Sequence, residues 1–107
     1  MKLFLNTSDN LKTIVKLDDN NYEFEYKSPR DQNVMGALLD SLENEQKDLT
    51  NITEVEVFTG PGSFTGLRVG ISIANALSFA LNIPINGEKA GTVINPYYGK
   101  EPNITKK

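Results

Sequence analysis

Residues 60–87 of this 107-residue chain contain one charged side chain, Arg68, whereas 23% of all residues are charged. A helix on the surface of a globular domain normally has one apolar stripe and a polar back. Between Leu67 and Leu81, however, apolar or small residues occur at almost every angle around a helix. One side of such a helix can cover the chain's own sheet, so we expect a second cover over the other side.

Both ends of this helix are marked in the sequence. Gly60-Pro61-Gly62 predicts a type II turn, because Pro fixes φ at the first central position and Gly tolerates a positive φ at the second. Ser63 follows as an N-cap that accepts a hydrogen bond from a free amide of the first turn. Asn82 and Ile83-Pro84 predict the end of the helix, since Pro disfavours helical geometry in the residue before it.

Small residues recur at every fourth position of this helix and form one row along it. Such a row lets another backbone approach closely, and a Gly inside a helix costs about 1 kcal/mol relative to Ala. The approaching element is either a partner or another helix of the same chain, and the two interpretations can hold for different parts of the row. The row consists of Gly66, Gly70, Ala74 and Ser78.

The composition excludes several function classes. The chain has no His and no Cys, which removes the commonest general base, the commonest metal ligand and all thiolate chemistry. A formal net charge of -3 opposes direct binding of nucleic acid, because neutralising phosphates requires a basic face. The apolar run near the N-terminus is too short for a signal peptide, and we expect no membrane-spanning segment and a cytoplasmic protein.

The order of the predicted elements is that of a single α/β domain. Residues 22–26 and 54–57 alternate apolar and acidic side chains, which indicates strands with one buried and one wet face. We therefore expect a five-stranded mixed sheet with both helices mainly on one face, and Glu23, Glu25, Glu54 and Glu56 on the other. The predicted strands are 2–6, 11–17, 22–27, 54–58 and 83–86.

The first helix is predicted to begin at Pro29, with Ser28 as its N-cap and Asp31 in its first turn, and to end near Lys47. Its apolar residues recur at helical spacing and form one face. Gly36 also lies in this segment. The apolar face consists of Val34, Met35, Leu38, Leu39 and Leu42.

Two alternative sites arise from these patterns. The four strand carboxylates would form a metal site only if they clustered, and nothing else at the spacing of a metal motif accompanies them.

The glycine-rich turn opens a helix and presents free amides to an anion or nucleotide, but it lacks the Lys-Ser/Thr pair of a Walker loop. Without His, a hydroxyl nucleophile has no obvious base, so we expect no catalytic residue. The candidate anion contacts are Gly62, Ser63, Thr65 and Arg68.

The glycine-rich segment resembles the signature of the TsaB (YeaZ) family. The matching residues are 60–70, with the sequence GPGSFTGLRVG, which follow a predicted strand and open an apolar helix that ends in Ile83-Pro84-Ile85. Residues 3–8 and 94–106 also resemble the family's first strand and C-terminal tail. The resemblance implies an actin-like/RNase H-like (ASKHA) subdomain over 1–87, followed by a linker and an extended tail over 88–107.

Two departures from the family pattern bear on function. Family members carry a second subdomain before the tail, whereas residues 87–93 form the whole connection here, so the chain resembles a compact form without that subdomain. Asn6 stands where the family commonly has Asp, an acid that serves phosphate or metal chemistry in related actin-like ATPases. The second departure argues against catalysis by this chain.

The resemblance implies a non-catalytic scaffold. TsaB proteins are inactive relatives of TsaD, which transfers a threonylcarbamoyl group to adenosine 37 of tRNA, and they pair with TsaD through their first two helices. The pair recruits the ATPase TsaE, so ATP belongs to the complex, tRNA is reached only through it, and no metal or cofactor is expected in this chain. By analogy, the expected partner surface is Val34, Leu38, Leu42, Gly66, Gly70, Ile73, Ala74 and Leu77.

Two other functions remain open: a homodimeric interaction module that does not depend on TsaD, and an independent hydrolase or protease, against which the absence of His and Cys counts.

The tail also has two interpretations, because its large contact side chains and limited backbone freedom favour docking in a groove, whereas chain ends are often disordered. The docking surface could be its own sheet or a partner. The tail residues in question are Pro96, Tyr97, Tyr98, Pro102 and Ile104.

Overall fold

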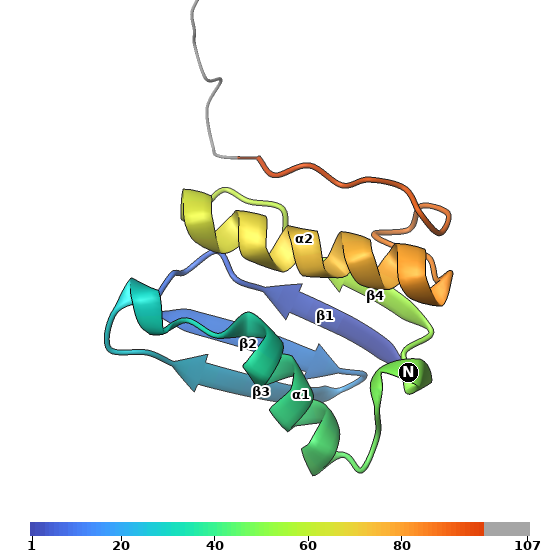
Figure 1. Ribbon diagram of the computed structural model, residues 1–107, viewed down its shortest axis with the longest axis horizontal. Helices are drawn as coiled ribbons and strands as arrows, with labels where there is room; N and C mark the ends of the chain where they lie inside the picture. Colours follow the sequence, from blue (N-terminus) through green and yellow to red (C-terminus); the bar gives the residue numbers. More distant parts are fainter. Residues whose placement is uncertain (98–107) are drawn as a thin grey trace, which may run out of the picture.

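Four strands and two α-helices make up residues 1–97, the part of the chain that the computed structural model describes (Figure 1). The helices are α1 (Val34–Asn44) and α2 (Phe64–Leu81), and the short 3₁₀ turns η1 (Pro29–Asp31) and η2 (Leu49–Asn51) lie on either side of α1. The strands are β1 (Lys2–Asn6), β2 (Lys12–Leu17), β3 (Asn20–Glu25) and β4 (Glu54–Val57).

The strands form a mixed sheet in the order β3-β2-β1-β4. β1 pairs antiparallel with β2 and parallel with β4, so Leu3 lies opposite Leu17 on one side and Val55 on the other. Short turns join the antiparallel strands, whereas α1 lies between β3 and β4 in the chain. A long connection of this kind is what a parallel pairing requires.

The prediction of a fifth strand over residues 83–86 is wrong. Within this segment only Ile85 forms a bridge to β4, and this bridge is parallel to Val55. Val55 donates its N–H to the Pro84 carbonyl (3.0 Å) and accepts from the Asn86 N–H (2.9 Å). Asn86 then adopts a φ of 50°, and its side-chain amide pairs with both backbone groups of Val57 (2.8 and 3.1 Å). The side chain of Asn86 thus takes the place of the next backbone pairing with β4, and the sheet has four strands instead of five.

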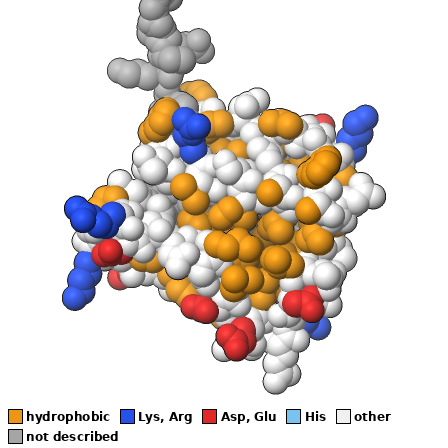
Figure 2. Space-filling view, in the orientation of Figure 1, with side chains coloured by type: hydrophobic (Ala, Val, Ile, Leu, Met, Phe, Trp, Pro, Cys, Tyr) orange, Lys and Arg blue, Asp and Glu red, His pale blue; other side chains and the backbone are white. Residues whose placement is uncertain are grey.

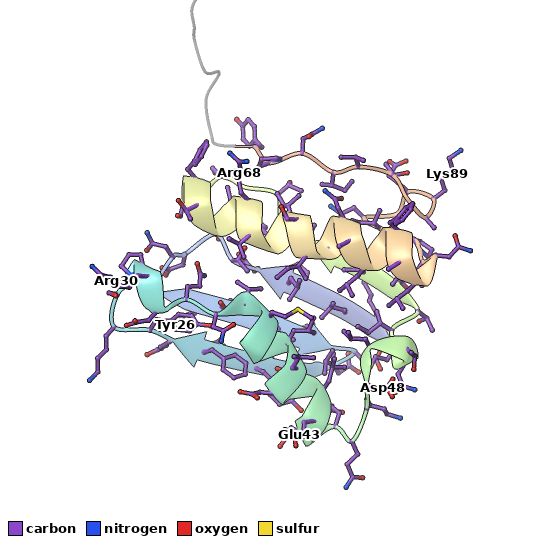
Figure 3. All side chains as sticks on the ribbon, viewed as in Figure 1. Tyr26, Arg30, Glu43, Asp48, Arg68 and Lys89 are labelled. Atoms are coloured by element: carbon purple, nitrogen blue, oxygen red, sulfur yellow. The ribbon has the colours of Figure 1, made fainter. Side chains whose placement is uncertain are left out.

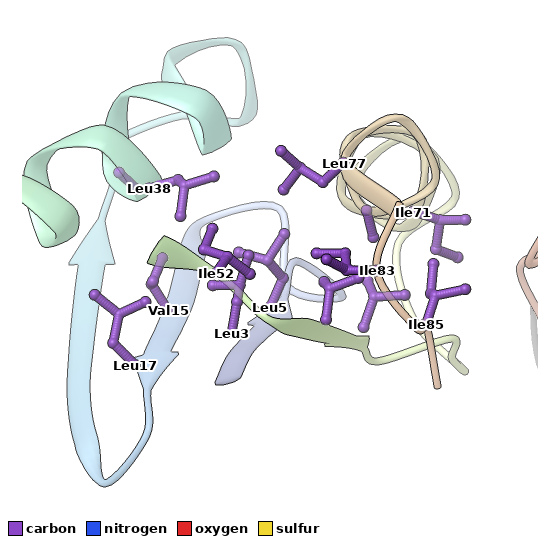
Figure 4. Close-up of a cluster of buried hydrophobic side chains, with 14 of the residues drawn as sticks. Leu3, Leu5, Val15, Leu17, Leu38, Ile52, Ile71, Leu77, Ile83 and Ile85 are labelled. Carbon is purple, nitrogen blue, oxygen red and sulfur yellow. The ribbon is translucent and has the colours of Figure 1, made fainter. Parts of the chain in front are cut away.

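Both helices lie on one face of the sheet, and the hydrophobic core lies between the two layers (Figures 1 and 4). In Figure 4, Leu38 of α1 and Leu77 of α2 lie on the helix side of Leu3 and Leu5 from β1. The alternation predicted from the sequence places the acidic side chains on the opposite, exposed face. This prediction is confirmed for Glu23, Glu25, Glu54 and Glu56.

Two of these carboxylates form ion pairs across the open sheet face. Lys2 Nζ lies 2.9 Å from Glu56, and Lys12 Nζ lies 3.6 Å from Glu23. Exposed pairs of this kind contribute about 0–1 kcal/mol each. Within residues 1–97 no three acidic side chains come together as a group that could hold a metal ion, so the structure does not support the metal-site alternative.

α1 begins later and ends earlier than the sequence predicted. Ser28-Pro29 starts only η1, and α1 is capped instead by Asn33, whose side-chain oxygen accepts a backbone N–H of the first turn (2.9 Å). The helix ends at Asn44 and not near Lys47. The left-handed backbone of Gln46, with a φ of 58°, prevents the helix from continuing.

The predicted ends of α2 are confirmed. Ser63 Oγ accepts a backbone N–H of the first turn (3.2 Å), and Asn82 ends the helix in the left-handed conformation with a φ of 55°. The predicted type II turn before the helix is wrong. The positive φ (126°) belongs to Gly60 and not to Gly62, and the peptide bond before Pro61 is cis.

α2 is also long and apolar enough to cross a membrane by length and composition alone, with 18 residues and a mean hydropathy of 1.4. The sequence led us to expect no membrane-spanning segment, and a match by length and composition alone is weak evidence for one. In the structure, 39% of the helix is buried inside the protein. The core helix of a globular domain satisfies the same criterion.

The small-residue row on α2 packs against Thr7 and Ile83 of the same chain. Thr7, just after β1, donates its hydroxyl to the Gly66 carbonyl (2.6 Å). A Cβ added to Gly66 would lie 2.2 Å from the Thr7 carbonyl oxygen, and one added to Gly70 would lie 2.2 Å from Thr7 Oγ1. Ser78 Oγ donates to the Ile83 carbonyl (2.8 Å). At Gly66, Gly70 and Ser78 the row therefore meets Thr7 and Ile83 of the same chain and not another helix, and the approach of a partner to the row stays a prediction.

Replacing Gly70 by Ala should destabilise the fold, although Ala is the better helix former. The new Cβ would crowd Thr7, so we expect the free energy of unfolding in urea to fall by about 1–3 kcal/mol. The loss should be smaller when Thr7→Ala removes the crowded atoms. Ala76→Gly, at an exposed position of the same helix, should cost only helix propensity, about 1 kcal/mol. A Gly70→Ala protein as stable as the wild type would contradict this packing.

A hydrogen-bonded cluster joins β3 to the end of α1. Tyr22 donates its hydroxyl to the Glu45 carboxylate, and Asn20 donates its side-chain amide to the same oxygen (2.9 Å). Asn44 donates to the Tyr22 hydroxyl oxygen (3.0 Å). The hydrogen bond to Glu45 raises the pKa of Tyr22 above its usual value, because loss of the proton would remove this bond and place two negative charges together.

Alkaline pH should therefore weaken the fold through Tyr22. Because the folded-state pKa is the higher one, the stability that this hydroxyl contributes is complete below about pH 10 and is lost as the pH rises through the folded-state pKa. Urea unfolding between about pH 8 and about pH 11 should show a steeper loss for the wild type than for Tyr22→Phe. If the wild type and Tyr22→Phe lost stability in parallel as the pH rises, the cluster would not retain the proton of the Tyr22 hydroxyl.

Candidate protein-binding surface

Most of the residues predicted to contact a partner lie in the core. Leu38 and Ala74 have no exposed surface, whereas Ile73 is half-buried at the edge of the core. The buried side chains are covered by the chain's own fold, and their contact with a partner stays a prediction. The buried members of the predicted surface are Val34, Leu38, Leu42, Gly66, Gly70, Ala74 and Leu77.

Other apolar side chains of the same two helices remain at the surface. Leu39 of α1 is 47% exposed and Met35 is 38% exposed, while Val69 of α2 is 40% exposed. Figure 2 shows hydrophobic side chains gathered over the region where Figure 1 shows α1 and α2, and the two helices contact each other. We name this surface the helix face and define it as Met35, Leu39, Val69, Ile73 and Ala76.

The helix face follows from helical geometry. Met35 and Leu39 are four residues apart, and Val69, Ile73 and Ala76 follow one another at spacings of four and three, so each set forms a line along its helix. The sequence predicted Met35 and Leu39 as part of one apolar face. It did not separate the half that meets the sheet from the half that does not, and Val69 was missed for the same reason.

The glycine-rich loop before α2 packs against the chain's own β1–β2 turn. The Ser63 N–H donates to the Ser8 carbonyl (2.7 Å), and a Cβ on Gly62 would lie 2.5 Å from Ser8 Cβ. Arg68 Cζ lies 5.4 Å from the centroid of the Phe64 ring, in cation–π geometry. The anion or nucleotide contact expected here is untested and stays a prediction. It concerns Gly62, Ser63, Thr65 and Arg68.

Residues 88–97 turn back and run beside α2 (Figure 1). The Asn75 side chain donates to the Ile94 carbonyl (3.0 Å) and accepts from the Ile94 N–H (2.9 Å). At the end of this segment the Tyr97 N–H donates to the Thr59 carbonyl (2.6 Å). This part of the tail therefore docks on its own helix and not on the sheet. The tail residues Tyr98, Pro102 and Ile104 lie outside the described residues.

α2 thus has three kinds of surroundings. The sheet covers its buried side, and residues 88–97 lie along one flank, so the second cover predicted from the sequence is partly supplied by the tail. Val69, Ile73 and Ala76 form one accessible apolar line along α2, and Phe64 and Phe79, which are 56% and 80% exposed, are further apolar side chains at its surface. α1 contacts α2 and also exposes Met35 and Leu39, so the helix face combines accessible apolar residues of both helices and is suited to binding another protein.

Comparison with known proteins identifies relatives of this chain. Residues 29–90 match the family model described as TsaD, tRNA N6-adenosine threonylcarbamoyltransferase. The chain is 38% identical over 56 residues to the tRNA threonylcarbamoyladenosine biosynthesis protein TsaB of Escherichia coli (strain K12), and 40% identical over 50 residues to TsaB of Bacillus subtilis (strain 168). Among solved structures, YeaZ from Pseudomonas aeruginosa is similar with a TM-score of 0.64 and 26% identity.

These similarities cover only part of each relative. They include 52% and 47% of this chain but 24% and 20% of the two TsaB proteins. The structural match covers 78% of this chain and 42% of the Pseudomonas YeaZ chain. The chain therefore spans less than half the length of the relatives that it matches.

Two adjacent leucines of α1 should respond differently to truncation. Leu38→Ala removes a side chain with no exposed surface and should lower the free energy of unfolding by about 2–5 kcal/mol. Leu39→Ala, at a position that is 47% exposed, should change it by no more than about 0.5–1 kcal/mol. Urea denaturation of both variants checks this contrast. Equal losses would place Leu39 in the core and remove it from the helix face.

Proposed function

Because this chain belongs to the TsaD (tRNA N6-adenosine threonylcarbamoyltransferase) family, and within it to the TsaB (YeaZ) proteins, we propose that it is a non-catalytic scaffold in tRNA threonylcarbamoyladenosine biosynthesis. In this proposal the helix face pairs with TsaD and supports threonylcarbamoyl transfer to adenosine 37 of tRNA. TsaE joins the pair, ATP is used by the complex, and tRNA is reached only through it. The chain acts in the cytoplasm without a metal or cofactor of its own.

The observation that carries the proposal is the apolar helix face. Single exposed apolar residues are normal, but a contiguous patch on a small domain marks an interaction site. Leu39 and Val69 come from different helices, and both are at least two-fifths exposed. Two partner helices laid over α1 and α2 would bury these side chains in a four-helix arrangement.

Four hydroxyl groups near α1 and α2 support a scaffold in preference to an enzyme. Ser63 caps α2, and Thr7 donates to a backbone carbonyl at 2.6 Å. Ser41 and Ser78 each donate to a backbone carbonyl at 2.8 Å. These hydroxyls are engaged in holding the fold, and the chain has neither His nor Cys to activate another nucleophile.

We also propose that the sheet is the core of an actin-like/RNase H-like (ASKHA) subdomain. The support is the strand order β3-β2-β1-β4, with an antiparallel meander followed by a parallel β4. The parallel bridge between Val55 and Ile85 stands where a fifth parallel strand would extend the sheet.

Leu39→Glu and Val69→Glu should each prevent a 1:1 complex with TsaD from the same organism, because pairing would bury an uncompensated carboxylate. We expect affinity to fall by a factor of about 100 or more, measured by light scattering on a size-exclusion column. Leu11→Glu is the matched control, since Leu11 is 41% exposed in the turn between β1 and β2. This variant should pair as the wild type does.

Other outcomes would redirect the assignment. A complex that survives both glutamate substitutions would place TsaD on another surface of the chain. A wild-type chain that forms a homodimer and ignores TsaD would reject the scaffold function and favour a homodimeric interaction module.

A further inference from the structure

A hollow lies at the end of the helix face, where α1 ends and the chain turns through η2. Its volume is about 580 Å³, which is within the range of ligand pockets. Its apolar lining comes from three leucines, one of which, Leu39, also belongs to the helix face, so the two surfaces are continuous. We name this hollow the leucine pocket. It is lined by Leu39, Leu42, Glu43, Gln46, Lys47, Asp48, Leu49 and Thr50.

Hydrogen bonds hold the wall of the leucine pocket in place. The Lys47 N–H donates to the Leu42 carbonyl (2.9 Å), which closes the end of α1. The Asp48 carboxylate accepts from the Thr50 N–H (2.9 Å), and the Asp48 N–H donates to the Asn51 side chain (2.9 Å). An incoming side chain therefore meets a preformed wall, and little ordering is required on binding.

Acidic side chains border the pocket. Glu43 projects from the last turn of α1 and Asp48 lies next to η2 (Figure 3), and Figure 2 shows acidic side chains along the edge of the hydrophobic surface. Hydrogen bonds from Thr50 lower the pKa of Asp48, so this carboxylate is charged at neutral pH. Among the lining residues, the acids outnumber the single base, Lys47.

We propose that the leucine pocket receives an apolar side chain that is flanked by Lys or Arg in a partner polypeptide. Leu39 and Leu49 would contact the apolar side chain over a floor formed by the buried Leu42, while Glu43 and Asp48 would attract the neighbouring cations. The inference rests on the proposed function, because the pocket continues the surface assigned to TsaD, and it adds the chemistry that the partner must present. An acidic peptide or a nucleic acid would meet like charge at this border.

The test uses short peptides and does not require the partner. The capped hexapeptide Lys-Lys-Leu-Leu-Lys-Lys is added to the nitrogen-15-labelled chain, and backbone amide shifts are followed by NMR. We expect shifts concentrated in residues 39–51. The peptides Glu-Glu-Leu-Leu-Glu-Glu and Lys-Lys-Ser-Ser-Lys-Lys, which lack the charge match and the apolar anchor respectively, should bind about fivefold more weakly or worse.

Two variants that change the net charge by the same amount distinguish the effect of a charge at the pocket from the effect of the overall charge. Glu43→Lys should weaken binding of the basic leucine peptide about fivefold or more. Glu25→Lys, on the exposed sheet face, should leave that binding unchanged. Equal binding of the basic and acidic leucine peptides, shifts concentrated outside residues 39–51, or equal effects of the two variants would overturn the inference.

Mixing with TsaD distinguishes failure of the pocket from failure of the proposed function. If the basic peptide shifts residues 39–51 but TsaD does not pair with the chain, the pocket assignment stands and the scaffold function is rejected. If TsaD pairs equally with the wild type and Glu43→Lys, and the basic peptide causes no shifts, the pocket assignment is rejected and the scaffold function stands.

Discussion

The contact between Thr7 and α2 sets the distance between the helix and the sheet. The buried Thr7 hydroxyl is satisfied by the Gly66 carbonyl at 2.6 Å, which avoids the cost of about 1–3 kcal/mol for an unpaired buried polar group. A side chain at Gly66 or Gly70 would force the two elements apart. With the helix held this close, Leu67 of α2 reaches the core and has no exposed surface.

The same close approach determines which part of α2 is available to another protein. The small residues are used where the helix meets β1, and Asn75 is used to hold the returning tail through paired hydrogen bonds with Ile94. Val69 is 40% exposed, whereas Ile73 is half-buried at the edge of the core. Part of the apolar excess that is visible in the sequence of α2 is therefore used in the core, and the rest remains at the surface, in the helix face and at Phe64 and Phe79.

Local signals in the sequence were sufficient for the ends of α2 and for the open sheet face, because Ser63, Asn82 and the alternating strands act through neighbouring residues. They were not sufficient for the partner surface. Helical spacing fixes the angle between Leu38 and Leu39 but not which of them faces the sheet, since that depends on how the helix docks. The position of the tail could not be predicted either, because the Asn75–Ile94 pairing joins residues that are 19 apart in the sequence and follow no repeating pattern. The fifth strand was overpredicted because the side chain of Asn86 takes the place of backbone.

The pairing of residues 84–86 with β4 leaves the two edges of the sheet unequal. The outward N–H and C=O groups of Val55 and Val57 are all taken, and Ile85 is in turn closed by reciprocal hydrogen bonds with Glu88 (2.8 and 3.0 Å). Within residues 1–97, β3 is therefore the edge that retains a row of unpaired backbone groups for strand addition. A sheet with one sealed edge can join a second copy edge to edge but cannot propagate, so growth into a continuous cross-β fibre is blocked as long as this fold is intact.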